Sequence, residues 1–70
     1  MSSTPSVTPD DLIRILRKHG FEIVRSKGSH QILKNRVTGK MTIVPMHKRD
    51  LPKGTLLAIL KQAGIDKDEL

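Results

Sequence analysis

Residues 21–34 read FEIVRSKGSHQILK, and their pattern predicts a β-hairpin. The first part, residues 21–25, alternates apolar and polar side chains and is rich in residue types that favour strands. Residues 26–29 combine Ser and Gly and predict a turn, and residues 30–34 predict the returning strand.

A third strand is expected to follow this hairpin. Residues 35–39 predict a second hairpin loop with Gly39 at its end, and residues 40–44 predict a strand that Pro45 stops. Because both connections are short, we expect the three strands to form an antiparallel meander.

One amphipathic helix is predicted on each side of the strands. Thr8 is a typical N-cap and Pro9 suits the first helical position, so the helical spacing of the apolar residues places the first helix at residues 9–19. Pro52 opens the second predicted helix and Gly64 ends it. The order is α-β-β-β-α, an α+β fold with two helices on one face of a three-stranded antiparallel sheet. The other face is expected to stay open to solvent or a ligand.

The composition limits the class of protein. The chain has 70 residues, no Cys, Trp or Tyr, and one Phe. We expect a single domain at residues 8–70, behind a disordered lead-in at residues 1–7. The lack of Cys excludes disulfides and Cys-based sites. The sequence also contains no apolar run of about 18 residues, the length that a membrane-spanning helix needs. The scarcity of aromatic residues argues against binding single strands by base stacking. Because no signal-peptide pattern is present, we expect a cytoplasmic protein.

The positive charge is concentrated in the middle of the chain. The formal net charge is +6, from 13 Lys and Arg against seven Asp and Glu. Residues 23–49 hold seven of the basic residues and none of the acidic ones. Such a block favours a surface that faces phosphates, although a solvated face that keeps a small protein soluble is the simpler alternative. The candidates for phosphate contacts are Arg25, Lys27, Lys40 and Lys48.

His30 is the candidate catalytic residue. It follows Gly28 and Ser29 at the junction of turn and strand, inside the acid-free window. An imidazole exchanges protons near neutral pH, which is what RNA cleavage by the 2′-hydroxyl requires, and neighbouring cations stabilise the transition state. A plain hydrogen-bonding role stays open, and Ser29 as a nucleophile lacks a nearby carboxylate. Strand parity does not decide which face His30 occupies, because Ile32 shares its parity and favours the core.

The three histidines do not predict a metal site. His19, His30 and His47 lack the spacing of metal ligands, and no Cys or neighbouring acid supports them. We therefore expect neither a metal nor another cofactor. His19 is expected to be partly buried near the end of the first helix, where its positive form is favoured.

Four short motifs follow one another along the chain. They are GSH at residues 28–30, VPMH at 44–47, DLPKGTL at 50–56 and ILKQAG at 59–64. In this order and spacing they resemble the HicA toxin family of bacterial and archaeal toxin–antitoxin pairs. The resemblance runs from about Leu12 to Ile65, which is most of the chain.

The resemblance implies a double-stranded-RNA-binding-domain-like fold and the toxin of a type II toxin–antitoxin system, an mRNA interferase that hydrolyses RNA. It implies His30 as the catalytic residue, with Gly28, Ser29 and His47 as supporting residues and the role of His47 open. Many members carry a second His after the first, whereas this chain has Gln31. The implied partners are mRNA and a HicB-like antitoxin, with the toxin a monomer when free and a hetero-oligomer with its antitoxin.

Two other functions stay open. The chain is alternatively a non-catalytic RNA-binding domain of the same fold, but domains that bind duplex RNA place a Lys cluster at the start of the second helix. This chain has only Lys53 there. The remaining alternative is a protein-interaction domain whose basic face serves an acidic partner.

Overall fold

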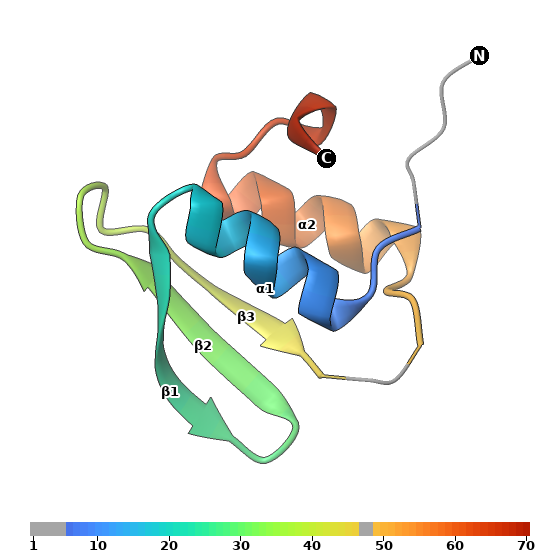
Figure 1. Ribbon diagram of the computed structural model, residues 1–70, viewed down its shortest axis with the longest axis horizontal. Coiled ribbons are helices and arrows are strands. Elements are labelled where there is room, and N and C mark those ends of the chain that lie inside the picture. Colours follow the sequence, from blue (N-terminus) through green and yellow to red (C-terminus); the bar gives the residue numbers. More distant parts are fainter. Residues whose placement is uncertain (1–5, 47–48) are drawn as a thin grey trace.

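The computed structural model describes residues 6–46 and 49–70. Its strands form one antiparallel sheet in the order β1-β2-β3, and two helices cover one face of that sheet (Figure 1). The predicted α-β-β-β-α order and its double-stranded-RNA-binding-domain-like topology are confirmed. The elements are α1 (Pro9–Lys18), β1 (Phe21–Lys27), β2 (His30–Asn35), β3 (Met41–Pro45), α2 (Lys53–Ala63) and the short 3₁₀ helix η1 (Lys67–Glu69).

A capping box starts α1. The hydroxyl of Thr8 accepts a hydrogen bond from the Asp11 backbone N–H at 3.1 Å, and the Asp11 carboxylate accepts one from the Thr8 N–H at 3.3 Å. These hydrogen bonds from Thr8, with the nearby Arg14 charge, hold the pKa of Asp11 below its ordinary value of 3.8. The cap therefore satisfies donors that the first helical turn leaves without partners.

The end of α2 follows the predicted glycine stop. Gly64 has φ +72°, which a residue with a side chain adopts at a cost, and the Ile65 N–H donates to the Leu60 carbonyl at 2.9 Å. Pro52 sits at the N-cap of α2, one residue before the helix begins. At the other helix, His19 is the C-cap, so α1 ends one residue earlier than predicted.

The strands extend further than predicted, because the first turn is tighter than its sequence suggests. Only Gly28 and Ser29 form the turn, and Lys27 pairs directly with His30, so β1 runs two residues beyond Arg25. A two-residue loop with a positive φ at its first position is typical of a type II′ hairpin, and Gly28 has φ +58°.

The second hairpin shifts by one residue. β2 includes Asn35, and β3 covers Met41–Pro45, so Pro45 belongs to the strand rather than stopping it. An edge strand tolerates proline because one side of its backbone makes no ladder hydrogen bonds.

The core lies between the helices and the sheet. Its largest fully buried side chains come from both helices and all three strands: Phe21, Leu12, Leu16, Leu33, Leu56, Leu60 and Val44. Val7 is buried too, and its carbonyl accepts a hydrogen bond from the Leu51 N–H at 2.8 Å. The domain start at residue 8 and the disordered lead-in stay predictions, since residues 1–5 lie outside the described part.

The register separates two faces of the sheet. Leu33, Thr42 and Val44 are buried on the face beneath the helices, which we call the helix face. The alternate residues form the open face, where the register groups them in three rows across the sheet. These rows are Lys27, His30 and Pro45; Arg25, Ile32 and Ile43; and Glu22, Lys34 and Met41. The register slips by one residue at Val24, the signature of a β-bulge.

Candidate active site on the open face of the sheet

The structure settles which face His30 occupies. Leu33 and Asn35 are buried on the helix face, so the alternating pleat places His30 on the open face, where it is exposed. Ile32 lies on the same face, but its apolar side chain does not make that face part of the core. It pairs with Ile43 of β3 and is only partly buried. The physical condition for a catalytic His30, access to solvent and ligand, is met.

Contacts around the first turn hold His30 in place. The Met46 N–H at the end of β3 donates to the Ser29 carbonyl at 2.6 Å, which ties the turn to the third strand. On the helix face, the Ser26 hydroxyl donates to the Gln31 side-chain oxygen at 2.6 Å. The backbone of His30 is therefore held by pairing with β1 and β3 and by the turn before it.

An open hollow lies beside His30. Its lining residues come from the first turn and from the centre of the sheet: Lys27, Gly28, Ser29, His30, Ile32 and Ile43. Three predicted site residues, Gly28, Ser29 and His30, thus share one concave surface with the predicted phosphate ligand Lys27. The arrangement offers one imidazole, one ammonium group and an apolar floor.

The electrostatics of the open face favour an anion. Arg25, Lys27 and Lys34 form no ion pair within residues 6–46 and 49–70. In the three strands, the only acid on this face is Glu22, and its carboxylate is paired with Arg36 at 2.6 Å. Among the described residues, no carboxylate lines the hollow around His30, so none repels a phosphate bound there.

The other predicted site residues lie elsewhere. Lys40 is at the far end of the sheet from His30, and its ammonium group lies next to Gly64, where a Cβ added to that glycine would meet it. A cation there suits the C-terminal end of α2. His47 and Lys48, one a supporting residue and one a phosphate candidate, lie outside the described residues.

His19 has a local structural role. Its Nδ1 is 2.9 Å from the Ile15 carbonyl, and its Nε2 is 3.4 Å from a Glu69 carboxylate oxygen. The side chain is partly buried, as predicted. Across the described ranges, no group of three or more His, Cys, Asp or Glu side chains is placed to hold a metal ion.

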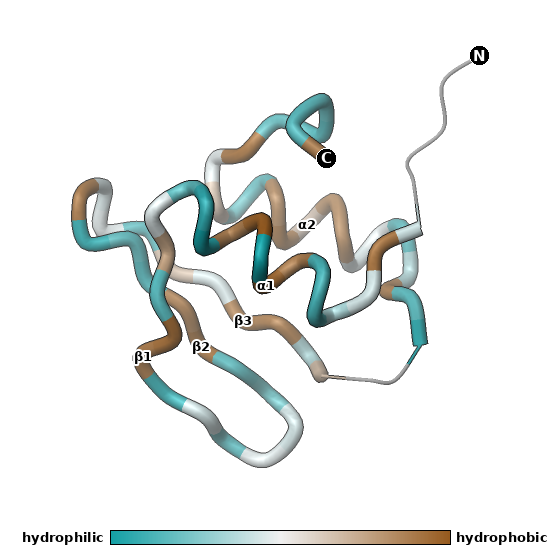
Figure 2. Tube along the Cα trace, viewed as in Figure 1, coloured by the Kyte–Doolittle hydropathy of each residue, from teal (hydrophilic) through white to brown (hydrophobic). Residues whose placement is uncertain are grey.

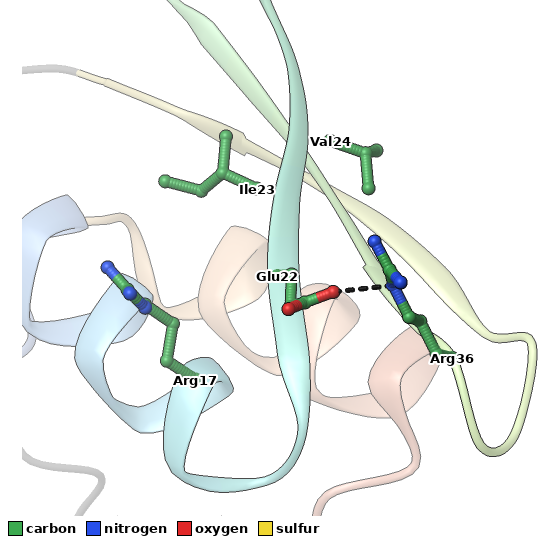
Figure 3. A pocket seen from close by; sticks show the side chains of 5 residues that line it. All are labelled: Arg17, Glu22, Ile23, Val24 and Arg36. Carbon is green, nitrogen blue, oxygen red and sulfur yellow. Dashed lines mark ion pairs between the residues drawn. The ribbon is translucent and has the colours of Figure 1, made fainter.

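A second hollow lies at the opposite end of β1. Arg17 approaches it from α1 and Arg36 from the loop after β2, and Glu22 of β1 pairs with Arg36 (Figure 3). Its floor is formed by Ile23 and Val24 on β1. Its lining, as far as the structure describes the chain, contains no imidazole, and its carboxylate is already paired, so it offers no group for proton transfer near neutral pH.

Lys34 and Ile43 belong to this face, although the sequence alone does not single them out. Lys34 shares its parity with His30, but Ile32 has the same parity and favours the core, so parity does not assign Lys34 to a face. Ile43 gave no signal, because residues 42–44 contain two apolar side chains of opposite parity. Only the pairing of β3 with β2 shows which of them is buried.

Comparison with known proteins identifies one family. The family model described as HicA toxin of bacterial toxin-antitoxin matches residues 9–65, which includes α1, the three strands and α2 but not η1. A comparison with curated protein sequences found no match. In the part of the chain that the structure describes, no helix has the length and apolar character needed to cross a bilayer.

Proposed function

The chain belongs to the HicA toxin family of bacterial toxin–antitoxin systems, and on this premise we propose that it is a metal-independent endoribonuclease that cleaves mRNA with His30 as general acid or base. The observation that carries the proposal is the exposed His30 in a hollow whose described lining contains Lys27 and no carboxylate. Family membership supports the toxin assignment, and the chemistry of this hollow supports the reaction.

The proposed reaction uses a nucleophile that the substrate itself supplies. The 2′-hydroxyl loses its proton, and its oxygen attacks the adjacent phosphorus. The bond from phosphorus to the 5′-oxygen then breaks, and that oxygen takes up a proton. The products are a 2′,3′-cyclic phosphate and a free 5′-hydroxyl. His30 accepts the first proton or donates the second, and either role is within the reach of an imidazole near neutral pH.

The cations of the open face support the same reaction. The phosphate gains negative charge in the transition state, and Lys27 lies in the same row of the sheet as His30. Arg25 lies in the next row and suits a neighbouring phosphate of the backbone. We assign Gly28 and Ser29 to shaping the turn under the hollow. The role of His47 stays a prediction, as do the phosphate contacts of Lys40 and Lys48.

Gln31 replaces the second histidine that the family resemblance leads one to expect. It lies on the helix face and accepts a hydrogen bond from Ser26, so its side chain is on the opposite side of the sheet from the hollow. The position after His30 therefore contributes nothing to the proposed proton transfer. The missing second imidazole does not weaken the assignment of His30.

The partner that we propose is a HicB-like antitoxin that covers the open face in the cytoplasm. The free toxin is then a monomer, and the inhibited form is a hetero-oligomer with that antitoxin. The basic character of the open face suits an acidic covering surface as well as RNA, so binding of the antitoxin and of RNA should exclude each other.

The test is a cleavage assay in the presence of a chelator. A single-stranded RNA oligonucleotide is incubated with the purified protein, and the new ends are identified by mass spectrometry. We expect a cyclic phosphate on one product and a 5′-hydroxyl on the other. The same oligonucleotide with a 2′-deoxyribose at the mapped cleavage position should stay intact.

Three results would contradict the proposal. They are cleavage that requires an added divalent cation, cleavage of the deoxy-substituted position, and binding of RNA without any product. The last of these would favour the non-catalytic RNA-binding alternative. The single Lys53 at the start of α2 already gives that alternative little support as a duplex binder.

A further inference from the structure

On the open face, the two edge strands present different kinds of side chain. Along β3 its residues are all apolar: Met41, Ile43 and Pro45, which we call the β3 stripe. Met41 is 52 % exposed and Ile43 is 50 % exposed. Along β1 the corresponding residues are all charged. Figure 2, which colours all residues of both faces, shows β3 largely hydrophobic and the end of β1 largely hydrophilic.

The hollow beside His30 is lined by residues from both the charged strand β1 and the apolar strand β3. Lys27 lies at its cationic side, while Ile32 and Ile43 form its apolar floor. A ligand that places an anionic group near Lys27 and His30 therefore has an apolar surface next to that group. Nucleotides have this character, because each one joins a charged phosphate to a flat, weakly polar base.

We propose that the β3 stripe is a base-binding subsite that receives the unpaired bases flanking the scissile phosphate. The sugar–phosphate backbone then follows β1 and β2, over Arg25 and Lys27, with its bases directed towards β3. This inference rests on the proposed function and adds that the substrate is single-stranded at the cleavage position.

The geometry favours a single strand over a duplex. Successive rows of the open face are about 6.6 Å apart, two residues along a strand, which suits the repeat of an extended nucleotide chain. In a duplex the faces of the bases are stacked and hidden, so the β3 stripe would have no partner there. Charge complementarity also favours RNA, because unpaired Arg25, Lys27 and Lys34 border the apolar strip in the described residues.

The subsite is aliphatic, and its contribution is correspondingly modest. Single-strand binders commonly stack bases on aromatic rings, and this face has none. The β3 stripe and the neighbouring Ile32 of β2 offer contact area for any base, without hydrogen bonds that would read its identity. We therefore expect weak sequence preference from the β3 stripe and dominant affinity from the phosphates.

The test measures binding separately from cleavage. The probe is an RNA oligonucleotide with a 2′-deoxyribose at the mapped cleavage position, or at every position if no cleavage is found. It is used alone and annealed to its complement. We expect the wild type to bind the single strand at least about tenfold more tightly than the duplex. Ile43→Ser should weaken single-strand binding about fivefold, since half of an isoleucine surface is lost from the contact.

Two further variants keep the test decisive. Val37→Ser is the matched control, because Val37 is 93 % exposed in the loop between β2 and β3 and lies off the stripe. It should bind like the wild type. Ile43→Phe adds an aromatic platform and should tighten single-strand binding about fivefold. This gain does not depend on whether Ile43→Ser folds well.

The outcomes separate this inference from the proposed function. Equal affinity for single strand and duplex overturns the inference, as does unchanged affinity in both Ile43 variants. The latter result would leave the stripe as an antitoxin surface. If the unmodified oligonucleotide is still cleaved in either case, the nuclease proposal stands alone. Failure of the wild type to cleave unmodified RNA refutes the nuclease proposal whatever the binding data show.

Discussion

The two faces of the sheet are built from alternate residues of the same strands, yet they have opposite environments. On the helix face, Leu33 and Val44 have no exposed surface and join the helices in one core. On the open face, Ile43 lies between Thr42 and Val44 in sequence but is half exposed. The difference teaches that the buried contacts that stabilise the fold lie mainly on one face, while the other face is the one on which we propose that ligands bind. Substitutions on the two faces should therefore affect different measurements.

The largest expected effect on stability is at Leu33. Leu33→Ala removes a fully buried side chain and should lower the free energy of unfolding by about 2–5 kcal/mol. Ile43→Ala, one row away on the other face, should cost no more than about 1 kcal/mol. Urea denaturation followed by circular dichroism measures both. Equal losses would show that the open face is part of the folding core.

A smaller loss of stability is expected at Asn35, a buried polar residue on the helix face at the end of β2. Its buried side chain donates to the His19 carbonyl at 2.9 Å and accepts from the Val37 and Thr38 N–H groups at 2.8 and 3.1 Å. Asn35→Ala should cost about 2 kcal/mol, because it removes three partly buried hydrogen bonds to backbone groups.

The neighbouring Arg36 provides the control for this position. Arg36→Ala breaks only the exposed pair with Glu22 and should change the free energy of unfolding by less than about 1 kcal/mol. If Arg36→Ala cost as much as Asn35→Ala, the hydrogen bonds of Asn35 would not account for its effect.

Of the three stabilising sites, Leu33, Asn35 and the capping box, the capping box is expected to contribute least. Thr8→Ala removes the N-cap and should cost about 1 kcal/mol at neutral pH. Because the folded pKa of Asp11 is lowered, its carboxylate stabilises the fold above the ordinary pKa of 3.8, and this is lost as the pH falls through the folded pKa. The difference between wild type and Thr8→Ala should therefore shrink below pH 3.8. The capping box would be contradicted if the difference in free energy of unfolding between wild type and Thr8→Ala stayed constant as the pH falls to the point of acid unfolding.

Much of the fold could be predicted from local sequence signals. Thr8, Pro9 and Gly64 act through the backbone of their own helix ends, so their effects are visible in a short window. The strand ends were wrong by one or two residues, because a two-residue turn and a four-residue turn are both compatible with Ser, Lys, Gly and Ser at residues 26–29.

The candidate site could be predicted only in part. His30 and Lys27 were identified because they are chemically distinctive and stand in an acid-free stretch. The face that they occupy depends on pairing between strands. This pairing places Ile32 beside Ile43 on the open face and Leu33 in the core. The β3 stripe was missed for the same reason, since exposure of Met41 and Ile43 is a property of the assembled sheet.

The most direct test of the account is the single-turnover rate of RNA cleavage in a chelator by the wild type and His30→Ala. His19→Gln serves as the control histidine, since His19 lies at the end of α1 and contacts Ile15 and Glu69. We predict that His30→Ala cleaves about 10²- to 10⁴-fold more slowly with an unchanged free energy of unfolding, while His19→Gln keeps the wild-type rate. A His30→Ala variant that cleaves as fast as the wild type would contradict the account.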